Sequence, residues 1–262
     1  MAGFGSSEVE VALLIRSDDP RQMAEEIAGL TAMGAYLLVP REPLSIHDLH
    51  FDTPEGSLAA QYVALRLRTI GTEPWITLKG PARQTAWGGT ERMELEMPWS
   101  PEAAGEVAEA LRTCGVRVRA PQFTAAAPLN TMVGIGLAVI QDRETRRWPR
   151  NVVRADDLDQ WPRAELAVDC VTFRLARDVV LYEVEVEAKA DDGPAAARSV
   201  ADDLVARYGP TLRRWPHGKL ATGLAAGALL SRGALDGLLA SGNLLSPEAC
   251  DRIEEYLTSR ER

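Results

Sequence analysis

Charged side chains at a spacing of two recur in several separated segments of the chain. Glu8 and Glu10 lie near the N-terminus, and a late segment carries Glu183, Glu185 and Glu187. Cations and further carboxylates recur at the same spacing in the middle of the chain, namely Arg66, Arg68, Arg92, Glu94 and Glu96. Carboxylate oxygens are ligands of Mg²⁺ and Mn²⁺, whereas Arg and Lys bind phosphoryl oxygens. These residue types could therefore hold a phosphate-bearing ligand together with a divalent cation.

A spacing of two places side chains on one face of a β-strand. The alternation predicts strands over residues 8–16, 62–69, 75–80, 92–97 and 182–189, and more weakly over 135–147, which carries Arg143, and 165–173, which carries Asp169. Proline at the first residue and glycine just after the last residue are typical of helices, and they predict helices over residues 20–33, 101–114 and 194–208. Residues 220–262 are rich in Ala and Leu and lose the strand pattern, so we expect helices there.

The apolar faces of the predicted strands are continuous Val, Ile, Leu and Met, which must be covered. If the predicted helices cover them, the charges point to the inside of a curved sheet, and closure of that sheet gives a charged tunnel. We therefore predict an α+β fold, a closed antiparallel barrel with helices packed outside, with residues 1–224 as the barrel domain and 225–262 as a helical C-terminal extension. Two alternatives stay open: the charges of a single strand commonly face solvent, and opposite charges could simply pair across strands.

Composition narrows the classes of function. The chain has 262 residues and a net charge of -9, which disfavours broad binding to nucleic acid or to an anionic membrane. Three well-separated cysteines suggest neither disulfides nor a thiolate metal site. We see no signal peptide, and no run approaches the roughly 18 apolar residues of a membrane span. We therefore expect a cytoplasmic protein whose polyanion site is enclosed.

Six segments resemble, in order, the motifs of the CYTH superfamily of triphosphate tunnel metalloenzymes, over roughly residues 8–224. Glu8-Val9-Glu10 resembles the start of the family's ExExK motif, and residues 50–54 (HFDTP) resemble its YFDTP turn. Residues 64–68 (ALRLR), 75–81 (WITLKGP) and 92–96 (RMELE) are similar to three of its strands, and 183–189 (EVEVEAK) to a fourth. Residues 217–220 (HGKL) lie where the family has Ser-Lys.

This resemblance implies a metal-dependent triphosphatase that acts on inorganic triphosphate, thiamine triphosphate or a nucleoside triphosphate. It implies Mg²⁺ or Mn²⁺ as the cofactor and a small-molecule triphosphate as the partner, with a homodimer as a possible assembly. The implied metal ligands are Glu8, Glu10, Glu183, Glu185 and Glu187. The implied phosphate-binding residues are Arg66, Arg68, Lys79, Arg92, Arg143 and Lys219. The implied catalytic residues are Glu94, Glu96, Lys79 and Arg66.

Two points of this correspondence stay open. The lysine of ExExK is Ala12 here, and Arg16, which shares its parity, is a candidate replacement further along the strand. Arg143 shares parity with Gln141, but the neighbouring Arg146 and Arg147 offer other registers. The missing lysine keeps two alternatives in view: a class IV-type adenylate cyclase, and a protein that binds polyphosphate or a nucleotide without turnover.

Overall fold

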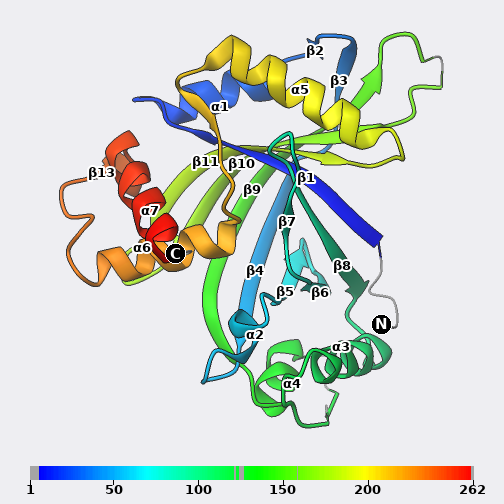
Figure 1. Ribbon diagram of the computed structural model, residues 1–262, viewed down its shortest axis with the longest axis vertical. Coiled ribbons are helices and arrows are strands. Elements are labelled where there is room, and N and C mark those ends of the chain that lie inside the picture. The colour runs from blue at the N-terminus through cyan, green and yellow to red at the C-terminus, as the bar shows by residue number, and fades with distance from the viewer. Residues whose placement is uncertain (1–5, 121, 124–126, 158, 261–262) are drawn as a thin grey trace. The chain divides into compact units, whose positions relative to one another are not determined.

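The computed structural model describes residues 6–120, 122–123, 127–157 and 159–260, and its long strands are the segments of alternating charge (Figure 1). The hydrogen-bonded order is β1-β8-β6-β5-β4-β9-β10-β11, and β11 also pairs with β1. These described strands therefore form a closed ring, which confirms the predicted barrel. They are β1 (Ser6–Ile15), β4 (Leu44–Asp52), β5 (Ala64–Ile70), β6 (Glu73–Lys79), β8 (Thr90–Pro98), β9 (Ala138–Arg154), β10 (Ala164–Arg174) and β11 (Val179–Ala188).

Strand β9 is longer than the sequence predicts. The alternating pattern ends at residue 147, but the strand continues to Arg154. Its last residues pair antiparallel with β3 (Tyr36–Pro40), so that Pro40 lies opposite Arg150 and Tyr36 opposite Arg154. This pairing gives the strand a partner that sequence periodicity does not reveal. The remaining strands are short: β2 (Ala32–Met33), β7 (Arg83–Gln84), β12 (Leu212–Arg214), β13 (Leu239–Ala240) and β14 (Leu244–Leu245).

The helices predicted to begin at residues 20 and 101 begin there, whereas two short helices, α2 (Ser57–Ala60) and α4 (Pro128–Gly134), are not predicted by the sequence. Asp19 and Ser100 cap α1 (Pro20–Ala28) and α3 (Pro101–Thr113), accepting hydrogen bonds from Gln22 N and Ala103 N at 3.0 and 3.1 Å. Helix α1 ends at Ala28 rather than at residue 33, because the chain turns at Gly29 and enters the β2–β3 hairpin. The others are α5 (Gly193–Tyr208), α6 (Lys219–Leu230), α7 (Pro247–Arg260) and the 3₁₀ turn η1 (Ser241–Asn243).

The chain folds into two compact units. Unit 1 comprises Met1–Glu8, Ile46–Arg83 and Glu91–Arg143, and unit 2 comprises Val9–Ser45, Gln84–Thr90 and Glu144–Arg262. In unit 1, the apolar faces of β5 and β6 pack against α3, with Leu65, Ile76 and Leu78 meeting Val107 and Leu111. This helix covers the strands as the sequence predicts.

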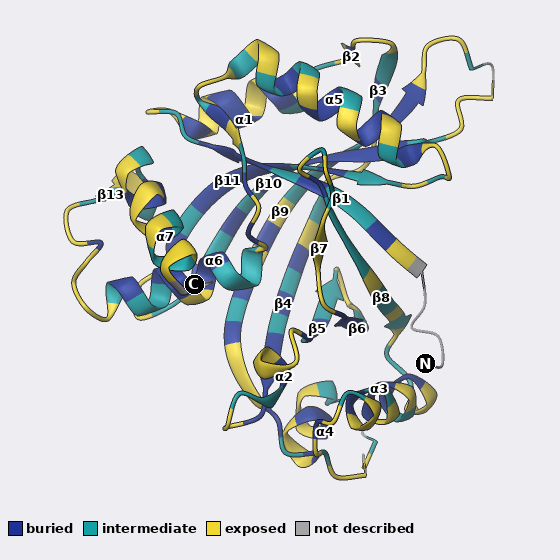
Figure 2. Cartoon of the chain, viewed as in Figure 1, coloured by how far each residue is buried: buried dark blue, intermediate teal, exposed yellow. Residues whose placement is uncertain are grey.

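In unit 2, helices α1 and α5 cover the apolar faces of β1, β10 and β11 (Figure 1). Val184 and Val186 of β11 are fully buried there against Ile27 of α1 and Val200 and Leu204 of α5. In Figure 2, buried residues follow the sides of α1 and α5 that meet the strands. Burial of this face leaves the alternate residues of the same strands on the opposite face, which we call the charged face.

The charged face of unit 2 changes character along the strands. Beyond its carboxylates it becomes apolar, and Leu14, Phe173 and Leu181 pack there against Ala226 of α6 and Ile253 of α7. The C-terminal extension is therefore built on the barrel strands, and it is not purely helical, since Leu244 of β14 pairs in parallel with Val180 of β11. Among the described residues, no helix is long and apolar enough to cross a membrane.

Candidate functional site

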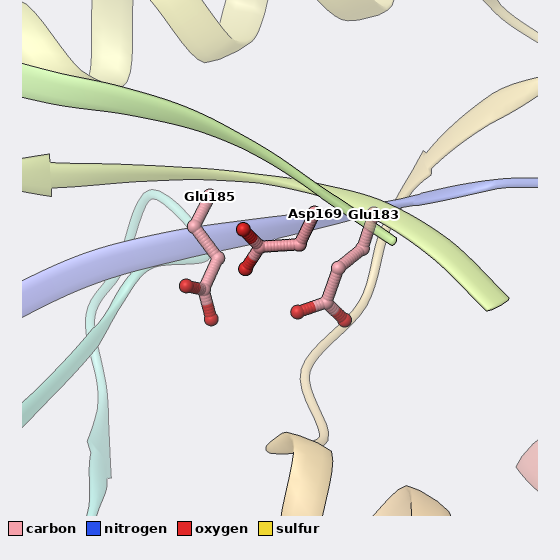
Figure 3. Close-up of side chains that lie close together, drawn as sticks. All are labelled: Asp169, Glu183 and Glu185. Atoms are coloured by element: carbon pink, nitrogen blue, oxygen red, sulfur yellow. The ribbon is translucent and has the colours of Figure 1, made fainter. Parts of the chain in front are cut away.

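Three carboxylates of unit 2 lie together on the charged face of β10 and β11. Asp169 lies directly opposite Glu183 in the antiparallel register, and Glu185 is the next residue of β11 on the same face. Each offers a carboxylate oxygen, and these oxygens lie within 4.8 Å of one another (Figure 3). We call Asp169, Glu183 and Glu185 the carboxylate cluster. The sequence predicts two of its members, Glu183 and Glu185, as metal ligands.

Two cations contact this cluster. Lys219, the first residue of α6, places its Nζ 3.1 Å from Asp169 Oδ2 and 2.5 Å from Glu185 Oε1, and it also forms an ion pair with Glu183. Arg147 of β9 donates from Nε and Nη2 to the two oxygens of Asp169 at 2.9 and 2.7 Å, and from Nη2 to Glu185 at 2.5 Å. The carboxylates therefore hold a lysine ammonium and an arginine guanidinium.

The charges of the cluster are unequal. Burial raises the pKa of Glu183 to about 7, against the opposing effect of Lys219. Although burial alone would lower the pKa of Lys219, contact with Glu183 and Glu185 raises it above its ordinary value. Three carboxylates thus face two cations, which leaves an excess of negative charge in the cluster.

The donor set fits a divalent metal ion. Carboxylate oxygens are hard ligands of the kind that Mg²⁺ and Mn²⁺ take, and the excess negative charge favours a further cation. Asp169, Glu183 and Glu185 would hold such an ion. The Lys219 ammonium contacts all three of these residues, so ion and ammonium would compete for the same oxygens.

The other predicted metal ligands lie elsewhere. Glu10 is opposite Glu187 in the β1–β11 register, and Glu187 is paired with Lys189 at 2.6 Å. Glu8 belongs to unit 1, where Lys79 Nζ donates to both of its oxygens at 2.8 and 2.7 Å and Arg92 Nε donates at 2.8 Å. Although burial opposes the shift, these two cations lower the pKa of Glu8 to about 2.

Unit 1 gathers arginines around one buried carboxylate. Asp48 of β4 lies opposite Arg68 of β5, which it binds through two hydrogen bonds, Nε to Oδ1 at 2.8 Å and Nη2 to Oδ2 at 3.0 Å. Arg143 of β9 donates from Nη2 to Asp48 Oδ2 at 2.5 Å. Arg66, two residues from Arg68 on β5, completes what we call the guanidinium cluster: Arg66, Arg68 and Arg143. Burial opposes ionisation of Asp48, but Arg143 and Arg66 hold its pKa well below the ordinary value.

The predicted catalytic residues adjoin this cluster on β6 and β8. Arg66 Nη2 lies 3.3 Å from Glu96 Oε1 and 3.7 Å from Glu94, and Lys79 Nζ lies 3.2 Å from Glu94. Thr77 donates from its hydroxyl to Glu96 at 2.9 Å. The structure therefore brings Arg66, Lys79, Glu94 and Glu96 together through direct ion pairs, as expected for one site.

Sequence reasoning did not assign Asp48, Asp169 or Arg147 to the site. Asp169 lay on a weakly predicted strand, where its parity with Glu165 was the available signal. In the sequence, Arg147 is an alternative to Arg143 as the phosphate-binding arginine of this strand. Both residues lie on the same face of β9, four residues apart, Arg143 in unit 1 and Arg147 in unit 2. Asp48 had no signal of its own, because its role depends on a cross-strand partner.

Ala12 occupies the position of the missing lysine, and Arg16 is the candidate replacement for it. Ala12 lies opposite Glu185 and packs at the edge of the apolar cluster under the C-terminal helices. Arg16 forms an ion pair with Asp251 and donates from Nη2 to the carbonyl of Pro247 at 3.0 Å. Arg16 is thus engaged with α7.

A family model described as the CYTH domain matches residues 7–209. Among solved structures, an adenylyl cyclase candidate from Hippeastrum, reported to have a dominant triphosphatase activity, is similar at 17% identity and a TM-score of 0.52, covering 86% of this chain and 96% of that one. A protein from Bacillus halodurans named as an adenylate cyclase is similar at 17% identity and a TM-score of 0.50, covering 82% and 97%. The curated proteins gave no match.

Proposed function

The chain belongs to the CYTH domain family, and we propose that it hydrolyses a triphosphate compound with the help of a divalent metal ion, transferring the terminal phosphoryl group to water. One observation carries the proposal: a chain with a net charge of -9 collects three guanidiniums in unit 1 and three metal-competent carboxylates in unit 2, at buried or half-buried positions of the strands. Removing these charges from water costs free energy unless they pair with one another or with a ligand.

The residues divide the work by their chemistry. We assign phosphate binding to Arg66, Arg68 and Arg143, with Lys79 and Arg92, because their N–H groups donate to phosphoryl oxygens and stabilise charge that develops there. Glu94 and Glu96, in contact with Arg66, are placed to orient that guanidinium and an attacking water. A bound Mg²⁺ or Mn²⁺ would supply charge neutralisation at the phosphoryl oxygens. We assign it to Asp169, Glu183 and Glu185, and propose Glu10 and Glu187 of the same unit as further ligands; for Glu8, in unit 1, a metal-binding role stays a prediction.

Ala12 favours a second candidate function, binding without turnover. Similarity at 17% identity to a protein with triphosphatase activity concerns the fold, so it does not choose between the two functions. The test is to incubate the full chain with tripolyphosphate, thiamine triphosphate and nucleoside triphosphates, each with Mg²⁺, Mn²⁺ or EDTA, and to identify the products. We expect metal-dependent orthophosphate release. Saturable binding without product would support the binder, and a cyclic nucleotide with pyrophosphate would identify a cyclase.

The metal assignment has its own test. In Glu185→Gln combined with Glu187→Gln we expect metal-dependent phosphate release to fall at least about a hundredfold, because two anionic oxygen donors are lost. The matched control is Glu25→Gln combined with Glu109→Gln, two exposed carboxylates on helices that lose the same charge. Turnover that is unchanged in the first variant, with circular dichroism showing an intact fold, would refute these residues as metal ligands.

A further inference from the structure

Asp48 has the burial of a core residue and the contacts of a site residue. Its side chain is 1% exposed, and Arg143 beside it is 2% exposed. Both carboxylate oxygens accept hydrogen bonds from Arg68, and Oδ2 also accepts one from Arg143. A single carboxylate thus binds two guanidiniums that come from different strands, β5 and β9.

These contacts restrict the two guanidiniums. A pair of parallel N–H···O bonds fixes the plane of Arg68 as well as its position. Arg143 uses one Nη2 group on Asp48, and its Nε is buried and without a hydrogen-bond partner among the described residues. Arg66 Nε is buried and unpartnered in the same way. Donors left unpaired in a buried site are costly unless a ligand satisfies them.

We propose that Asp48 is a positioning residue that holds Arg68 and Arg143 in place for the phosphate groups of the substrate. The inference rests on the proposed function, from which we take the phosphate-binding role of these arginines. Flexible arginines lose side-chain entropy when they bind an anion, and that loss is smaller when the guanidinium is already fixed. Asp48 fixes them before the substrate arrives.

Charge and position predict opposite results when Asp48 is neutralised. Asp48 carries negative charge among three guanidiniums, so a purely Coulombic role means that its removal strengthens anion binding. If Asp48 instead positions Arg68 and Arg143, its removal weakens anion binding despite the gain of net positive charge. Asp48→Asn separates the two effects, because it removes the charge with almost no change of volume. It also replaces one of the two acceptor oxygens by an NH₂ group, which cannot accept a hydrogen bond from an arginine.

The experiment measures the affinity of the full chain for tripolyphosphate by titration calorimetry in EDTA, so that no metal contributes. We expect Asp48→Asn to bind at least about tenfold more weakly than the unchanged protein, with kcat/KM lower in the same proportion when Mg²⁺ is supplied. The matched control is Glu91→Gln, which removes a carboxylate from a 2.6 Å pair with Arg83 on an exposed part of the same unit. We expect this control to bind normally.

The outcomes distinguish this inference from the proposed function. If the unchanged protein binds neither tripolyphosphate nor thiamine triphosphate nor a nucleoside triphosphate, with or without Mg²⁺, the proposed function fails and the inference fails with it. Binding by the unchanged protein together with equal or tighter binding by Asp48→Asn would overturn the positioning role alone.

A second measurement applies if Asp48→Asn does not fold. Arginine-selective NMR of the unchanged protein, assigned with Arg68→Lys and Arg143→Lys, reports rotation of each guanidinium. We expect slow rotation for Arg68 and Arg143 without ligand, in contrast to the exposed Arg117. Rotation as fast as that of Arg117 would contradict the proposal.

Discussion

The ammonium of Lys219 contacts all three residues of the carboxylate cluster. A lysine and a metal ion satisfy the same oxygens in different ways, because the ammonium donates hydrogen bonds whereas the ion is coordinated. Both bring positive charge to a cluster with an excess of carboxylates. Lys219 thus acts as an internal counter-ion of the cluster, and we propose that its release contributes to the free energy of metal binding.

Substitution of Lys219 tests this competition. We expect Lys219→Met to bind Mn²⁺ at least about tenfold more tightly than the unchanged protein, because the ion no longer displaces an ammonium from Asp169, Glu183 and Glu185. The measurement is electron paramagnetic resonance of free Mn²⁺ during a titration without phosphate. Arg198→Gln, on the exposed side of α5, changes the net charge equally and should leave the affinity unaltered. Equal or weaker binding by Lys219→Met would show that the ammonium does not compete.

At the scale of elements, one strand face serves two purposes. The charged face of β10 and β11 carries Asp169, Glu183 and Glu185, and further along it carries Val171, Phe173 and Leu181. Helices α6 and α7 pack on the apolar part, and the first residue of α6 is Lys219, which contacts the carboxylate cluster. The packing of the C-terminal extension therefore determines where the Lys219 ammonium lies.

Arg16 contacts α7, and its substitution distinguishes a role in packing of this helix from a role in phosphate binding. We expect Arg16→Ala to lower the free energy of unfolding by about 1–3 kcal/mol, because the contacts to Asp251 and to the Pro247 carbonyl of α7 are lost. Urea denaturation measures this change. The affinity for tripolyphosphate should stay within about twofold, since none of these contacts involves the guanidinium cluster. A large loss of affinity with little loss of stability would instead favour Arg16 as the replacement for the missing lysine.

The elements that the sequence predicts follow from local patterns of residues. The differences between prediction and structure arise from pairing with segments that are far apart in the sequence. Alternation located β5, β6, β8 and β11, and helices cover the apolar faces of β5, β6 and β11. The full length of β9 depends on its pairing with β3, and the early end of α1 on the β2–β3 hairpin. Arg143 and Arg147 were treated as alternatives because sequence does not show that a long strand can present both. Asp48 could not be assigned, because its hydrogen bonds join residues 20 and 95 positions apart.

At the scale of the whole molecule, buried ionisable groups couple the fold to pH. Burial and the charge of Arg143 lower the pKa of His50 well below its ordinary value, and Glu8 and Asp48 also have lowered pKa values. In each case the unfolded chain binds a proton more readily than the folded protein. These three groups therefore lower the free energy of unfolding as the pH falls, first His50 below its unfolded pKa of about 6.5, then the two carboxylates below about 4.5. Glu183, whose pKa burial raises to about 7, contributes in the opposite direction.

The His50 contribution can be isolated between pH 6.5 and 5. Over this range the unfolded chain takes up a proton at His50 that the folded protein excludes. His50 should therefore contribute a decline in the free energy of unfolding of up to about 1.4 kcal/mol per pH unit, or about 1.7 kcal/mol in total, against the opposite contribution of Glu183, which is the same in each variant. We expect His50→Gln to lose this decline, as measured by urea denaturation at several pH values. In His47→Gln the decline should persist, because His47 is 40% exposed and lies on the other face of β4. A decline of the same size in His50→Gln would mean that His50 is protonated in the folded protein, in spite of the arginines around it.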